Sequence, residues 1–124
     1  MPMASNFYEK ISLISEKDPR YKPDAYEFLI QALCFTQKRL GCQGHVSGNQ
    51  LLEGIRDLAI EQYGPLAKAV FNHWGIFRSL DFGNIVFNMI EQGVLTKTED
   101  DKLKDFENGF DFDKELDVFN SVKR

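Results

Sequence analysis

Apolar residues recur at three- and four-residue spacings along the first 93 positions of the chain, which is the period of helices that bury one face. Between these stretches lie proline, glycine and short polar runs, which break regular structure. The pattern predicts five helices, followed by a weaker one at the end of the chain. We expect them at residues 6–17, 23–40, 47–63, 65–74, 81–92 and 114–122.

Helix start and stop signals support these boundaries. Ser5 suits the N-cap of the first helix, and Pro23 suits the first turn of the second. Gly41 is placed to end the second helix in a left-handed conformation. Ser47 and Gln50 have the spacing of a capping box at the start of the third helix.

The third helix carries a glycine in its interior, where glycine is unfavourable by about 1 kcal/mol relative to alanine. Because Gly54 lies among apolar positions, we expect another backbone to approach it closely. The core predicted between the third, fourth and fifth helices consists of Leu51, Ile55, Val70, Trp74, Ile85 and Met89.

After the fifth helix the pattern changes. Residues 94–97 and 102–106 are separated by a polar turn at 98–101, which predicts a short β-hairpin. Phe110 and Phe112 alternate with acidic residues, which is typical of an extended segment. The order helix, helix, turn, helix, hairpin is that of a winged helix-turn-helix unit.

We therefore predict a single, mainly α domain over residues 1–124. Its winged helix-turn-helix-like three-helix core lies at about 47–92 and continues into the C-terminal β-hairpin, so that the core unit covers 47–106. Two N-terminal helices within 5–46 pack on this unit, and 107–124 form an acidic C-terminal segment. A length of 124 residues and a hydrophobic fraction of 43% suffice for a packed core without a staple.

Charge is unevenly distributed. Residues 99–117 hold nine acidic residues and three lysines, a net charge of −6, whereas the rest of the chain carries +2. Neither part has the strongly basic character of a nucleic-acid binder. The first ten residues lack the apolar stretch of a secretory signal, and no apolar run approaches the roughly 18 residues of a membrane span. We expect a cytoplasmic protein that keeps Cys34 and Cys42 reduced and has no membrane partner.

Several stretches resemble a family of short, uncharacterised conserved hypothetical bacterial proteins restricted to Verrucomicrobia and Planctomycetes. The resemblance covers roughly residues 8–112 and brings no activity, so no functional residue follows from it. The stretches that carry it are Asp18-Pro19-Arg20-Tyr21, Pro23-Asp24-Ala25-Tyr26, His45-Val46-Ser47-Gly48, Leu51-Leu52-Glu53-Gly54-Ile55-Arg56, Trp74-Gly75-Ile76, Asp81-Phe82-Gly83, Ile85-Val86-Phe87-Asn88-Met89 and Phe110-Asp111-Phe112.

Catalytic and metal-binding patterns are weak. Cys42 and His45 have a spacing seen in zinc sites, but a second ligand pair is missing. The stretch from Asp105 to Gly109 resembles the start of a calcium loop, but the required glycine and final acid do not follow. Ser47 near His45 is better explained as a helix cap. We predict a non-enzymatic protein without metal or cofactor.

Two binding functions remain open. The first is a binding or regulatory module that acts through protein contacts, with Phe87, Phe110 and Phe112 as candidate partner-binding residues. The alternative is a DNA-binding transcriptional regulator of the winged-helix type. It is disfavoured because the fifth helix has no cation and the residues at 99–101 are acidic. Its candidate residues are Asn84, Asn88, Gln92, Arg78 and Lys97.

Overall fold

The computed structural model describes residues 2–41, 46–95, 112 and 116, with side chains from residue 7 onward. The helices among them are α1 (Pro2–Lys17), α2 (Pro23–Leu40), α3 (Gly48–Tyr63), the 3-10 turn η1 (Gly64–Leu66), α4 (Ala67–His73) and α5 (Ser79–Glu91). The mainly helical character and the first five predicted helices are confirmed. The sixth, predicted at 114–122, lies outside the described residues except for Leu116.

The predicted caps of α2 and α3 are present, but the N-cap predicted at Ser5 is wrong, because α1 begins at Pro2 and Ser5 lies inside it. Gly41 ends α2 in the left-handed region at φ 69°. At the start of α3, the backbone N–H of Gln50 donates to Ser47 Oγ (3.1 Å) and the backbone N–H of Ser47 donates to Gln50 Oε1 (2.9 Å). These reciprocal bonds satisfy donors that the first helical turn leaves open.

The predicted hairpin is wrong, and with it the winged-helix fold class: within the residues that the structure describes there is no strand. Gly93 has φ +76°, and its N–H donates to the Ile90 carbonyl (3.0 Å). The N–H of Val94 donates to the Met89 carbonyl (2.8 Å). These two bonds make a Schellman motif, so Val94 belongs to the C-terminal cap of α5. The rest of the hairpin range, 96–106, lies outside the described residues.

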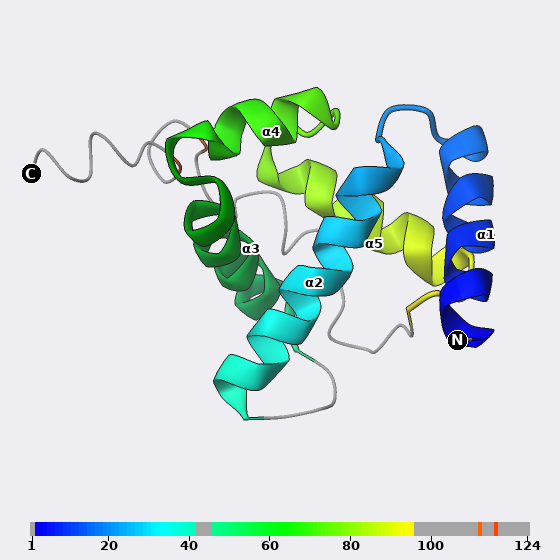
Figure 1. Cartoon of the computed structure of the whole chain (residues 1–124), viewed down its shortest axis with the longest axis horizontal. Helices are drawn as coiled ribbons and strands as arrows, with labels where there is room; N and C mark the ends of the chain where they lie inside the picture. Colours follow the sequence, from blue (N-terminus) through cyan, green and yellow to red (C-terminus); the bar gives the residue numbers. More distant parts are fainter. Residues whose placement is uncertain (1, 42–45, 96–111, 113–115, 117–124) are drawn as a thin grey trace, which may run out of the picture.

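The arrangement of the helices also differs from the prediction. Figure 1 shows α2 running through the middle of the molecule, with α3 on one side and α1 and α5 on the other. Helix α2 contacts α1, α3 and α5. It is therefore the centre of the fold rather than an addition to a 47–92 core. The physical reason is its wide apolar face, which buries Tyr26, Phe28 and Leu29 together with Ala25, Ala32 and Thr36.

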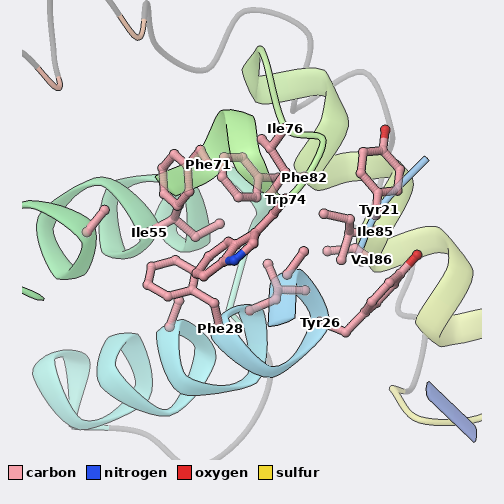
Figure 2. Packing of buried hydrophobic residues seen from close by; sticks show 14 of the residues in the cluster. Tyr21, Tyr26, Phe28, Ile55, Phe71, Trp74, Ile76, Phe82, Ile85 and Val86 are labelled. Atoms are coloured by element: carbon pink, nitrogen blue, oxygen red, sulfur yellow. The ribbon is translucent and has the colours of Figure 1, made fainter. Parts of the chain in front are cut away.

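An aromatic cluster fills the space where α2, α4 and α5 meet (Figure 2). Phe71 lies 5.5 Å from Phe28 and 5.1 Å from Phe82 between ring centroids, and Trp74 lies 5.6 Å from Phe28. Such tilted and edge-to-face pairs add stability beyond their buried area. Of the predicted core, Leu51, Ile55, Trp74, Ile85 and Met89 are buried, and Val70 is partly buried against them.

Candidate functional site: the outer faces of helix α5

Helix α5 presents three different faces. Phe82, Ile85, Val86 and Met89 point into the core. Asp81, Asn84 and Asn88 recur at helical spacing along one flank, which meets the loop between α1 and α2. Phe87 lies on the third face, away from the core, and is 53% exposed.

The flank begins with a hydrogen-bonded group around Tyr21. The Tyr21 hydroxyl donates to Asp81 Oδ1 at 2.6 Å and accepts from the side-chain amide of Asn84 at 3.0 Å. The other oxygen of Asp81 accepts the backbone N–H groups of Phe77 (2.8 Å) and Arg78 (3.1 Å), which lie just before the helix. Asp81 thus caps α5 and holds Tyr21 with the same carboxylate.

A second group lies one turn further along α5. The side-chain amide of Asn88 donates to Asp18 Oδ2 at 2.8 Å and to the Tyr26 hydroxyl at 3.1 Å. Arg20 donates to both oxygens of Asp18, at 2.8 and 2.7 Å. The loop between α1 and α2 is also held by a backbone bond, in which the N–H of Lys22 donates to the Trp74 carbonyl at 3.1 Å.

Glycine is required where this loop passes the turn before α5. Gly75 has φ +91°, and a Cβ atom there would overlap the carbonyl of Arg20. The close backbone contact therefore excludes any larger residue.

The network fixes the ionisation of its members. Hydrogen bonds from Arg20 lower the pKa of Asp18 to about 2, against the opposing effect of burial. Burial, with a further contribution from Asp81, raises the pKa of Tyr21, and burial raises the pKa of Tyr26. A general acid or base works best with a pKa near the ambient pH. These shifts move the pKa values of all three groups further from pH 7. The network is therefore suited to positioning side chains rather than to proton transfer.

A small cavity lies beside Asn88. It is lined by Ile14, Lys17, Asp18, Asn88, Glu91 and Gln92, and its volume is about 30 Å³. Organic ligands occupy pockets of roughly 300–1,000 Å³, whereas a single water needs only about 10–15 Å³. This cavity has room for one or two waters.

The predicted DNA-reading residues are not grouped on an open surface. Asn84 and Asn88 are engaged within the chain, and Gln92 forms the C-cap of α5. Arg78 is exposed, and Lys97 lies outside the described residues.

The predicted partner-binding residues are also separated. Phe87 is exposed, whereas Phe110 lies outside the described residues. Phe112 is only 5% exposed and packs 5.6 Å from Phe71, so the expected extended and open position for it is wrong. Its aromatic ring completes the core cluster.

Residues predicted as weak catalytic or metal sites receive no added support. Cys42 and His45 lie outside the described residues, and Ser47 is used as the cap of α3. Among the residues described, no group of three His, Cys, Asp or Glu side chains lies close enough together to hold a metal ion.

The network around Tyr21 and Asp18 was not predicted from the sequence. A signal was present, because Asp81, Asn84 and Asn88 mark one continuous flank of an otherwise apolar helix. The residues that these side chains bind could not be predicted, because the partners are distant in the chain: Asp18 and Asn88, for example, are 70 positions apart.

Comparisons of the chain with protein families, with curated proteins and with solved structures return no match. The family resemblance noted above stays a prediction.

In the described part of the chain, no helix is both long enough and apolar enough to cross a membrane.

Proposed function

We propose that this protein is a non-enzymatic binding module that acts through protein–protein contacts made by the outward face of α5. The observation that carries the proposal is the exposure of Phe87 on a helix that buries Phe82, Ile85, Val86 and Met89 in the core. Aromatic residues are enriched in protein interfaces and among the residues that contribute most to binding.

The setting of Phe87 supports this reading. Helix α5 is held on two sides, by the core and by the network with Tyr21 and Asp18, so its outward face has a fixed position. A rigid element loses little conformational freedom when a partner binds. Phe87 is therefore presented on a preorganised surface.

The alternative, DNA binding, has less support. Side chains that read bases need free donors and acceptors at the surface. The amide groups of Asn84 and Asn88 are instead donated to Tyr21, Asp18 and Tyr26.

The proposal is tested by comparing partner capture from native lysate by the wild-type protein and by Phe87→Ala. Leu66→Ala is a matched control, because Leu66 is also exposed (64%) but lies on η1. We expect nuclease-resistant partners whose capture falls about 30-fold with Phe87→Ala, the effect of losing about 2 kcal/mol at an interface hot spot. Capture by Leu66→Ala should match the wild type.

Thermal melting of each variant separates binding from folding. Both side chains are more than half exposed, so both variants should melt within about 2 °C of the wild type, as surface substitutions do. Partners that are retained by Phe87→Ala, or that disappear with nuclease, would contradict the proposal.

A further inference from the structure

The charges at the two ends of α5 are placed against the dipole of that helix. A helix dipole favours acidic side chains near the N-terminus and basic side chains near the C-terminus. Arg78, an exposed base, immediately precedes α5, and Glu91, an exposed acid, is its last residue. The acid of the first turn, Asp81, lies on the flank that binds Tyr21. Within one copy of the chain, the two exposed charges at the helix ends are therefore unfavourably placed.

The outward apolar residues of α5 share the symmetry of these charges. Leu80, which is half-buried, and Phe87, which is 53% exposed, are seven positions apart. Two helical turns separate them, so they lie on the same face. The midpoint between Leu80 and Phe87 is one residue from the midpoint between Arg78 and Glu91, which is about 1.5 Å along the axis. A single two-fold axis at this point therefore relates both pairs.

We infer that the partner of the outward face of α5 is the α5 of a second copy of this chain, packed antiparallel about that axis. Two-fold dimers use the same patch on both copies. Phe87 of each copy then packs on Leu80 of the other. Glu91 of each copy lies beside Arg78 and the positive end of the other helix, where its charge is favourable. The inference rests on the proposed function, because it names the partner of the same face.

One face of one helix makes a small interface, so the dimer is weak. Stable complexes bury about 1,200–2,000 Å² in total, and smaller contacts are transient. Each exposed ion pair strengthens binding by no more than about fivefold. We expect a dissociation constant of the order of 0.1 mM. The chain is then monomeric at micromolar concentrations and pairs where copies are concentrated or held side by side.

Sedimentation of the unmodified full chain tests whether it pairs. The average mass should rise from that of one chain toward that of two as the concentration approaches about ten times the dissociation constant. Phe87→Ala should pair about 30-fold more weakly, as after the loss of an interface hot spot. Leu66→Ala, exposed on η1, should pair like the wild type. An unmodified chain that stays monomeric over this range overturns the inference.

An exchange of charges tests the antiparallel arrangement. Arg78→Glu and Glu91→Arg each bring like charges together in the dimer, so each variant alone should pair about tenfold more weakly than the wild type. An equal mixture of the two variants should pair about as tightly as the wild type, because opposite charges then meet at both ends. Both substitutions agree with the dipole of α5, so the helix should stay intact. A mixture that pairs no better than either variant alone overturns the inference.

Failure of this inference is distinguishable from failure of the proposed function. If the full chain stays monomeric while capture from lysate still depends on Phe87, the outward face of α5 binds a different protein, and only the inference is overturned. If neither pairing nor capture depends on Phe87, both are overturned.

Discussion

Gly54 and Thr36 show how one small residue allows two helices to pack. A Cβ atom on Gly54 of α3 would overlap Thr36 Oγ1 of α2 and would lie 3.1 Å from Thr36 Cβ. Thr36 has little freedom to move, because it is buried and its hydroxyl donates to the Ala32 carbonyl at 2.7 Å. The interior glycine predicted the close approach of another backbone. The group that lies closest is instead the Thr36 side chain, and the Ala32 carbonyl would lie 3.6 Å from the added Cβ.

Gly54→Ala should therefore destabilise the protein, although alanine is the better helix former. Overpacking costs about 1–3 kcal/mol, and the gain in helix propensity of about 1 kcal/mol offsets only part of it. In urea unfolding, the double variant Gly54→Ala/Thr36→Ala should lose less free energy than the two single variants together, with a coupling of about 0.5–2 kcal/mol. Strict additivity would mean that the two residues do not meet in solution.

Asp18 gives the protein a specific acid sensitivity. Its pKa is about 2 in the folded state and 3.8 when unperturbed. A depressed carboxyl pKa stabilises the fold above the unfolded pKa, and this stabilisation is lost as the pH falls from about 4 to about 2. Because its partner Arg20 is 60% exposed, solvent screening reduces the effect to roughly 1 kcal/mol.

The urea midpoint of the wild type should consequently fall between pH 5 and pH 2 by more than that of Asp18→Asn, which has no carboxyl group to titrate. Glu16→Gln is a control, since Glu16 is an exposed acid two positions earlier. An identical fall in all three proteins would show that Asp18 has no special pairing in solution.

At the scale of elements, α5 is the helix most fully explained by its side chains. Its core face was readable from apolar spacing alone, and its boundaries agree with the prediction to within about two residues. Its polar flank serves as a second attachment, to the α1–α2 loop and to Tyr26 at the start of α2. The distinction between an attached flank and a solvent-facing one depends on residues distant in the sequence.

Asn88→Ala should test this attachment. The substitution removes the donor to Asp18 and Tyr26, and hydrogen bonds that involve a charged group contribute about 1.5–3 kcal/mol. Glu91→Ala, at an exposed position three residues further along the same helix, should change stability by less than about 0.5 kcal/mol. We expect the free energy of unfolding, measured in urea, to be lower for Asn88→Ala than for Glu91→Ala. We also expect faster hydrogen exchange of α5 amides in Asn88→Ala alone. Equal stability of the two variants would contradict the role of Asn88.

At the scale of the whole molecule, helix positions could be predicted but their assembly could not. Capping signals at Ser47 and Gly41 are local, so they determine local structure. The central place of α2 depends on contacts with α1, α3 and α5 at once, and the burial of Phe112 depends on Phe71 and Phe82. The strand expected at 94–97 failed because Val94, an apolar β-branched residue, satisfies a helix cap instead.

The charge of the whole molecule predicts weak binding to DNA. The chain carries a net charge of −4, and α5 itself holds Asp81 and Glu91 but no lysine or arginine. If about two phosphates are neutralised, the logarithm of the binding constant should fall with the logarithm of salt concentration with a slope of only about −2. Gel shifts with duplex DNA should show weak, sequence-independent retention at low salt and none at physiological salt.

The variant for this experiment has to be chosen from the structure. Replacing Asn84 and Asn88 would remove the partners of Tyr21 and Asp18, so a loss of DNA binding could reflect a displaced α5. Arg78→Ala is the better test, because its side chain is exposed at the start of α5, and its backbone N–H and carbonyl make its hydrogen bonds with Asp81. Sequence-selective retention at physiological salt that is lost in a normally folded Arg78→Ala would favour the DNA-binding function over protein binding through Phe87.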